Sequence, residues 1–308
     1  MNRITIVGAG RVGESTAAIL AREELCREIV LLDINEGVPQ GVALDIQQSG
    51  ALLRFDTRVS GDTDAAAMEG SELVIITAGL PRKPGMSRSD VLDANLVIID
   101  GIVDDVLRHA PDAMLMMVTN PVDVLTWYAW RKTGWPRQRV FGQSGALDTA
   151  RMTSFISMET GYSVKDISAL VLGGHGDAMV PLPRFTDIAG INIEHFLDGE
   201  TIGRIAERTR QGGGEILALK KHSSAYDSPA AAIASMVDAI GHNRRRIQPC
   251  VAVLDGEYDQ RGLAMGVPAV LDENGLVEIV ELKLNAVEEA DFRRSAELVR
   301  SDIGRLPS

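Results

Sequence analysis

Apolar residues follow two alternating patterns through the first half of the chain. Four segments are short and largely apolar, as buried parallel strands are: residues 3–7, 28–33, 72–79 and 113–121, the last of which ends at Asn120 and Pro121. Three further segments carry apolar residues at helical spacing and predict helices: residues 14–25, 91–108 and 122–133. Strands that alternate with helices are typical of an α/β fold, a doubly wound parallel sheet.

The second half has a mixed pattern. Helical spacing recurs near residues 146–160, 201–221, 228–241 and 286–304. Strand-like runs stand around residues 250–255, 264–271 and 276–281, and Asn274–Gly275 favours a hairpin turn between the last two. We therefore expect a mixed α+β unit here, and divide the chain into domains of residues 1–145 and 146–308.

The first strand leads directly into a glycine-rich turn. Residues 8–13 read GAGRVG and are followed by the first predicted helix. In this context Gly8 permits a tight turn, Gly10 lets a pyrophosphate approach the backbone, and Gly13 lets the helix pack closely on the sheet. The helix N-terminus offers free N–H groups to the phosphates.

An acidic residue ends the next strand. Asp33 stands 20 residues after Gly13, where a carboxylate accepts hydrogen bonds from the adenosine ribose and repels a 2′-phosphate. Residues 1–145 are thus predicted to be a Rossmann domain that binds NAD rather than NADP. The predicted cofactor contacts here are Gly8, Ala9, Gly10, Arg11, Val12, Gly13 and Asp33.

Composition disfavours several partners. The 308 residues carry a formal net charge of −12, which opposes binding to nucleic-acid phosphates and anionic membranes. Apolar runs stay below the roughly 18 residues of a membrane span, and Met1 leads straight into a predicted strand, so we expect neither a membrane span nor a signal peptide. Cys26 and Cys250 are expected to be buried, reduced thiols of a cytoplasmic protein. Six of the 31 basic residues are lysines, which fits either a salty cytoplasm or genomic base composition.

A short basic segment interrupts this acidic chain. Residues 79–90 read GLPRKPGMSRSD and contain two prolines, two glycines and three cations, which are Arg82, Lys83 and Arg88. The segment is a loop, either solvated surface or a lid. A lid would close its cations over an anionic substrate beside the dinucleotide and exclude water.

Three residues of the second half have the chemistry for transferring a proton and for binding a carboxylate. Asp148 and Arg151 share a helical face in the motif LDTAR, among small and apolar neighbours. The simple explanation is an ion pair between them on the protein surface. If Arg151 is buried, however, its guanidinium needs an anionic partner, and arginine can hold a carboxylate by two parallel hydrogen bonds. His175 stands between glycines in GGHGD, either in a plain turn between buried strands or as a site residue.

Together these motifs resemble the lactate/malate dehydrogenase family. GAGRVG, GLPRKPGMSR, VTNPVD, LDTAR and GGHGD occur in the order and approximate spacing of that family, over essentially the whole chain. The chain looks closest to the lactate-dehydrogenase-like malate dehydrogenases. The resemblance implies an oxidoreductase that transfers hydride reversibly between (S)-malate and NAD, giving oxaloacetate and NADH, in the tricarboxylic acid cycle.

The resemblance also implies a role for each matched residue. His175 is the proton acceptor, Asp148 orients its ring and stabilises the imidazolium, and Arg151 clamps the C1 carboxylate. Arg88 polarises the reacting carbonyl. Arg82 faces the second carboxylate of malate, where lactate enzymes tend to carry a neutral residue such as glutamine. Asn120 contacts the substrate, and further cofactor contacts are Asn95, Val118, Thr119 and Asn120.

Three alternatives to malate dehydrogenase stay open. A lactate dehydrogenase is disfavoured by Arg82. NAD-dependent glycosidases share the architecture but need a metal site with cysteine and histidine, and the sequence shows no such constellation, so no metal is expected. A non-catalytic NAD-binding module is disfavoured because the catalytic set is present.

Two further features are undecided by the sequence. Ala225 is either the floor of the substrate pocket or a helix-packing residue, and Asp227 stands where the resemblance leads us to expect an aromatic side chain. The family implies a homo-oligomer, with a tetramer favoured over a dimer.

Overall fold

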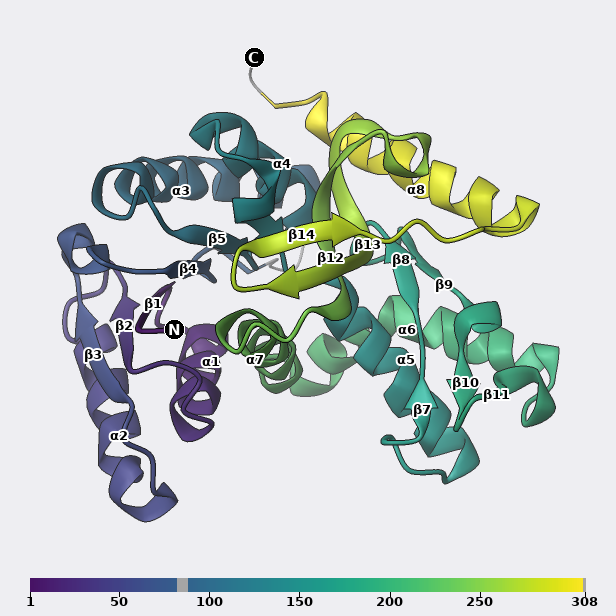
Figure 1. Ribbon diagram of the computed structural model, residues 1–308, viewed down its shortest axis with the longest axis horizontal. Coiled ribbons are helices and arrows are strands. Elements are labelled where there is room, and N and C mark those ends of the chain that lie inside the picture. The colour runs from purple at the N-terminus through teal and green to yellow at the C-terminus, as the bar shows by residue number, and fades with distance from the viewer. Residues whose placement is uncertain (82–87, 307–308) are drawn as a thin grey trace.

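Parallel strands form one side of a continuous sheet (Figure 1). The structure, a computed structural model, describes residues 1–81 and 88–306. In spatial order the parallel strands are β3 (Arg58–Asp62), β2 (Glu28–Leu32), β1 (Arg3–Val7), β4 (Leu73–Ile76), β5 (Met114–Met117) and β6 (Val140–Gly142). The helices that belong to this half are α1 (Arg11–Arg22), α2 (Val38–Leu53), α3 (Arg88–His109) and α4 (Val122–Thr133). The predicted doubly wound sheet is confirmed.

The register of these strands aligns their carboxyl ends. Val7 of β1 pairs with both Leu32 and Ile76. Ile76 pairs in turn with Met117, and Met117 with Gly142. The residues that follow these strands therefore lie along one edge of the sheet, which is where open α/β sheets bind their ligands.

Antiparallel strands extend the same sheet into the second half. They are β12 (Arg246–Asp255), β13 (Arg261–Asp272), β14 (Gly275–Ile279), β8 (Val171–Gly173) and β9 (Met179–Pro181). β12 joins the parallel half where Val251 pairs with Gly142. The sheet thus continues across residue 145, and the division of the chain into domains there stays a prediction.

The remaining elements complete the mixed second half. Its helices are α5 (Gly145–Thr160), α6 (Gly199–Lys220), α7 (Asp227–Gly241) and α8 (Ala286–Ile303). A small sheet contains β7 (Ile167–Ser168), β10 (Asp187–Ile188) and β11 (Ile191–Asn192). Short 3₁₀ helices are η1 (Ala65–Met68), η2 (Arg137–Arg139), η3 (Pro183–Phe185), η4 (Ile193–His195) and η5 (Glu257–Asp259). The predicted helices and hairpin of this half are present.

Several elements could not be predicted from the pattern of apolar residues. Helix α2 exposes Leu44 and Leu52 and has Gly41 and Gly50 in its interior, so it shows no clean apolar stripe. Strand β3 lies at the sheet edge and buries Val59 among polar or small residues. The strands of the small sheet have two residues each, too few to show an alternation.

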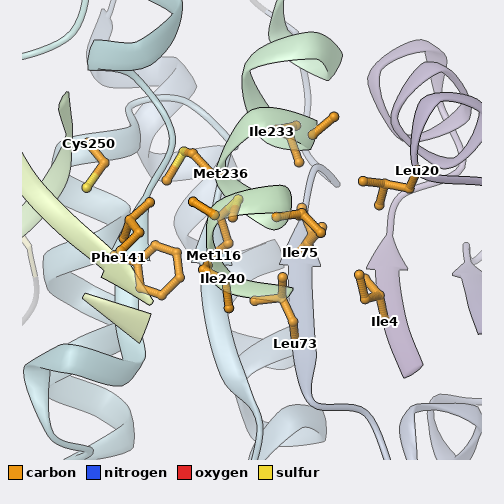
Figure 2. Close-up of a cluster of buried hydrophobic side chains, with 14 of the residues drawn as sticks. Ile4, Leu20, Leu73, Ile75, Met116, Phe141, Ile233, Met236, Ile240 and Cys250 are labelled. Atoms are coloured by element: carbon orange, nitrogen blue, oxygen red, sulfur yellow. The ribbon is translucent and has the colours of Figure 1, made fainter. Parts of the chain in front are cut away.

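Helices α1 and α7 pack on one face of the sheet, and α3 and α4 on the other (Figure 1). Figure 2 shows part of the first layer, in which α7 packs on neighbouring strands. The helix contributes Ile233, Met236 and Ile240, and strands β4, β5 and β6 contribute Ile75, Met116 and Phe141. Cys26 and Cys250 belong to this core and are free and buried, as predicted. Burial raises the pKa of both thiols to about 12.

Phe141 provides a test of this core. Its side chain is 0% exposed, so Phe141→Ala should lower the free energy of unfolding by about 3–5 kcal/mol through lost burial and a cavity. Urea unfolding measures the change. Val287→Ala is the control, because Val287 is 71% exposed and its truncation should stay within about 0.5 kcal/mol. Equal effects of the two variants would contradict the packing described above.

Candidate active site

The glycine turn after β1 has the shape of a phosphate cradle. Gly8 has φ +108°, and a Cβ there would lie 2.6 Å from the backbone nitrogen of Ala78. A Cβ on Gly13 would lie 1.9 Å from the carbonyl oxygen of Gly8. A Cβ on Gly10 would meet nothing within 4 Å, so the space in front of the α1 N-terminus is open. Gly10 caps α1 without a side-chain hydrogen bond, which leaves the first N–H groups of the helix for an anion.

Asp33 closes the same turn from the end of β2. Its Oδ2 accepts a hydrogen bond from the Ala9 backbone N–H at 2.9 Å, and its Oδ1 accepts from the backbone and side chain of Asn35 at 3.0 and 2.7 Å. The negative charge beside the turn fits a ribose with free hydroxyls and repels a 2′-phosphate. The open cradle, the uncapped helix and this carboxylate together fit NAD. Of the other predicted contacts, Arg11 is exposed and Val12 half-buried.

Asn95 connects the turns that follow β4 and β5. Its Oδ1 accepts a hydrogen bond from Leu80 N at 2.7 Å, and its Nδ2 donates to Asn120 O at 2.8 Å. Thr119 Oγ1 donates to Ala78 O at 2.6 Å, and Val118 N donates to Ile76 O at 2.9 Å. These contacts go to backbone groups and hold the two turns together. The prediction that these residues also contact the cofactor stays a prediction.

His175 lies in a loop between β8 and β9 that glycines shape. Gly173 and Gly176 have φ values of +88° and +90°, a region that residues with side chains rarely adopt. Two side chains from distant elements anchor the backbone between them. Ser295 Oγ of α8 accepts a hydrogen bond from Gly174 N at 2.8 Å, and Asp123 Oδ2 of α4 accepts from His175 N at 2.8 Å.

The predicted acid–base group is assembled around Asp148. This residue lies in the first turn of α5, directly after β6, and its side chain is 3% exposed. One carboxylate oxygen lies 2.9 Å from His175 Nδ1, and the other accepts a hydrogen bond from Arg151 Nη1 at 3.2 Å. The structure thus brings together the three residues that the sequence singled out in its second half.

Burial and the charge of Asp148 have opposite effects on the pKa values of His175 and Arg151. Burial lowers the pKa of His175, but the charge and hydrogen bond of Asp148 outweigh it, and the net shift is upward. Arg151 opposes that upward shift through like charge. Burial also lowers the pKa of the Arg151 guanidinium, against the attraction of Asp148. The histidine is therefore set to gain a proton more readily than an isolated buried imidazole.

Helix α6 approaches Arg151 through glycines. A Cβ on Gly212 would lie 3.2 Å from Arg151 Cδ, and a Cβ on Gly213 would lie 3.5 Å from its Nη2. The first distance is tighter than an ordinary contact and the second is not, so Gly212 leaves room for the Arg151 side chain. Within the described part of the chain, the buried Nε of Arg151 has no hydrogen-bond partner. The guanidinium thus has capacity for an anionic ligand.

The structure describes only some of the remaining predicted site residues. Arg82 lies outside the described residues, and so does the side chain of Arg88, which begins α3. Asn120 is exposed after β5, and its peptide bond to Pro121 is cis. Ala225 is half-buried just before α7, and Asp227 is the first residue of that helix.

Sequence reasoning missed the residues that support the group. Asp123 and Ser295 are far from His175 in the chain, and nothing in a single sequence joins them to it. A weak signal exists for each. Asp123 is an acid within an apolar segment, and Ser295 is a polar residue on the buried face of a helix.

Other site types find no support among residues 1–81 and 88–306. No group of three or more histidine, cysteine, aspartate or glutamate side chains there could hold a metal ion. In the same residues, every helix is too short or too polar to cross a membrane.

Comparisons with known proteins agree with this geometry. A sequence model described as lactate/malate dehydrogenase, NAD binding domain, matches residues 2–142, and one described as lactate/malate dehydrogenase, alpha/beta C-terminal domain, matches residues 145–306. The malate dehydrogenase of Thioalkalivibrio sulfidiphilus is 61% identical over 306 residues, which are 99% of this chain and 100% of that protein.

Solved structures of two related enzymes have the same fold. The malate dehydrogenase of Salinibacter ruber has a TM-score of 0.94 at 43% identity, over 98% of this chain and 96% of that one. The lactate dehydrogenase of Cryptosporidium parvum, solved with lactic acid and β-nicotinamide adenine dinucleotide, has a TM-score of 0.95 at 34% identity, over 99% of both chains. The predicted fold and NAD-binding region are confirmed, and the chain belongs to the lactate/malate dehydrogenase family.

Proposed function

We propose that this chain is an NAD-dependent malate dehydrogenase that interconverts (S)-malate and oxaloacetate, with His175 as the proton acceptor. The observation that carries the proposal is the buried Asp148 carboxylate, shared between His175 Nδ1 at 2.9 Å and Arg151 Nη1 at 3.2 Å. One carboxylate thus holds a base and a carboxylate clamp side by side, as oxidation of a 2-hydroxy acid requires.

His175 moves the proton of the reaction. Because Asp148 engages Nδ1, the proton of the C2 hydroxyl is exchanged at Nε2. As the ring becomes charged, Asp148 stabilises the imidazolium. Bound NAD supplies the redox chemistry by accepting the hydride that leaves C2. In the reverse direction the imidazolium returns its proton to the carbonyl oxygen of oxaloacetate.

The remaining roles concern binding. Gly8, Gly10 and Gly13 with the α1 N-terminus would hold the pyrophosphate, and Asp33 the ribose. Arg151 would clamp the C1 carboxylate with its unused hydrogen-bonding capacity. Asn120 would contact substrate and cofactor, and Arg88 would polarise the reacting carbonyl.

Substrate choice cannot come from the fold, because the chain matches a lactate dehydrogenase and a malate dehydrogenase about equally well in structure. We assign it to Arg82. A second carboxylate under a closed lid needs a charged partner, since an unpaired buried charge costs several kcal/mol. The name of the relative at 61% identity supports malate over lactate.

Three broader features also belong to the proposal. We place the enzyme in the cytoplasm and in the tricarboxylic acid cycle, and we propose a homotetramer. These statements rest on the family and, for the compartment, on the two buried free thiols.

The first experiment compares oxaloacetate with pyruvate in NADH oxidation. The wild type should strongly prefer oxaloacetate, and Arg82→Gln should lower kcat/KM for oxaloacetate by about a hundredfold, because one carboxylate loses its partner. Lys83→Gln, one residue further on, is the control and should keep the preference. A wild type that prefers pyruvate would indicate a lactate dehydrogenase. NADH binding without activity on either acid would indicate a non-catalytic module.

Asp148→Asn should lower the rate by about 10²- to 10⁴-fold and change its pH dependence. Reduction of oxaloacetate needs the protonated imidazole, so its rate falls as pH rises through the pKa of His175. Without the Asp148 charge, burial lowers the pKa of His175, so the decline in rate with rising pH should begin at a lower pH. Steady-state kinetics across pH measure both effects. Glu159→Gln, on the exposed side of the same helix, should change neither. An unmoved pH profile in Asp148→Asn would exclude the proposed role of its charge.

Two glycine variants separate folding from cofactor binding. Gly13→Ala should destabilise the protein, because its Cβ would lie 1.9 Å from a backbone oxygen. Gly10→Ala has open space around its Cβ and should fold normally, yet bind NADH about tenfold more weakly because the methyl stands where the pyrophosphate approaches. Thermal unfolding and fluorescence titration measure the two properties. Wild-type NADH affinity in Gly10→Ala would contradict this placement of the phosphates.

A further inference from the structure

Asp123 is a buried carboxylate to which the proposed reaction gives no role. It is the second residue of α4, lies between buried Val122 and Val124, and is 5% exposed. A carboxylate in such surroundings costs several kcal/mol unless hydrogen bonds and nearby positive charge compensate. The N-terminal end of the α4 dipole compensates in part and favours the ionised form. A buried acid at this cost needs a specific task.

The contact of Asp123 identifies that task. Its Oδ2 accepts the backbone N–H of His175 at 2.8 Å, across 52 residues of sequence. His175 has glycine on both sides, and Gly176 has a φ of +90°, so the loop by itself has many accessible conformations. A short, charge-assisted hydrogen bond to the histidine's own N–H fixes the point from which the ring extends.

A small cavity lies beside this contact. It has a volume of about 10 Å³ and is lined by Pro121, Asp123, Val124, Gly174, His175 and Ala178 together with Leu298, Val299 and Asp302 of α8. The space is about that of one water molecule. Asp123 itself is 5% exposed, so water screens its charge only weakly.

We infer that Asp123 is a positioning residue for His175, which fixes the backbone of the proton acceptor and adds a second negative charge near it. This inference rests on the function proposed above. Asp148 thus orients the ring from α5, and Asp123 holds the main chain from α4. The two carboxylates contact different atoms of one residue and approach it from different helices.

The charged groups around His175 define what each variant should change. Among the described residues they are Asp148 and Arg151 on α5, Asp123 on α4, Asp302 on α8 across the cavity, and exposed Asp177 in the loop itself. Burial lowers the pKa of His175, Asp148 and Asp123 raise it, and Arg151 lowers it. Removal of the Asp123 charge should therefore make the imidazolium less stable.

Asp123→Asn and Asp123→Ala separate anchoring from charge. The asparagine keeps an oxygen that accepts the His175 N–H but removes the charge. As pH rises, the rate of oxaloacetate reduction by Asp123→Asn should begin to decline at a lower pH than that of the wild type. The kcat at the optimum pH should change little. The alanine removes the anchor as well, and kcat should fall about tenfold to a hundredfold, because a misplaced base reacts slowly. KM for oxaloacetate should change less than kcat, because the arginines that bind the substrate are untouched.

Asp302→Asn is the matched control. It removes a carboxylate that lines the same cavity but makes no hydrogen bond to the His175 backbone and is not among the charges that shift the pKa of His175. It should therefore leave kcat and the pH profile near those of the wild type. Thermal unfolding of all three variants identifies any that fail to fold. A wild-type pH profile and kcat in a folded Asp123→Asn, together with a wild-type kcat in Asp123→Ala, would overturn the inference.

A measurement without turnover separates this inference from the proposed activity. Titration of the His175 ring by NMR in the free protein, assigned with His175→Gln, reports the pKa directly. Asp123→Asn should lower it and Asp302→Asn should not. An inactive protein with this shift would overturn the proposed function and leave the contact described here intact. An active protein in which Asp123→Asn leaves the pKa of His175 unchanged would exclude the charge role of Asp123.

Discussion

The site depends on a single carboxylate taken out of water. Asp148 is buried, so each of its oxygens needs a hydrogen-bond donor, and the two donors are His175 and Arg151. Burial alone would lower the pKa of both His175 and Arg151. The shared carboxylate outweighs burial for His175 and opposes it for Arg151. One buried charge therefore holds the imidazole and the guanidinium close together and favours the protonated form of the histidine.

The fold brings the parts of this group to one place by simple rules of sheet geometry. Aligned register puts the ends of β1, β2, β4, β5 and β6 along one edge, so the glycine turn and the start of α5 share that edge. The antiparallel strands β12 and β13 then connect this edge to β8, whose end carries the His175 loop. Glycines occur where backbones approach closely, as at Gly13, whose Cβ would lie 1.9 Å from the carbonyl oxygen of Gly8.

Local chemistry could be predicted from the sequence, and contacts between distant residues could not. The cradle of Gly8, Gly10 and Gly13 follows from spacing, because its parts are neighbours in the chain. Asp148 and Arg151 follow from helical periodicity in the same way. The anchors Asp123 and Ser295 depend on how α4 and α8 pack, which no local pattern records. Asn95 belongs with these anchors, because its hydrogen bonds to the turns after β4 and β5 link residues far apart in the chain, while its contact with the cofactor stays a prediction.

The Ser295 anchor has a consequence for the order in which the molecule becomes competent during synthesis. The strands and helices that make the dinucleotide cradle are complete once about half the chain has left the ribosome. The loop that carries His175 waits much longer, because Gly174 finds its partner in α8, the last helix. Helix α7, which covers one face of the same sheet, is also made in the second half of synthesis. The loop that carries His175 is fully anchored only when the carboxyl-terminal helix has docked.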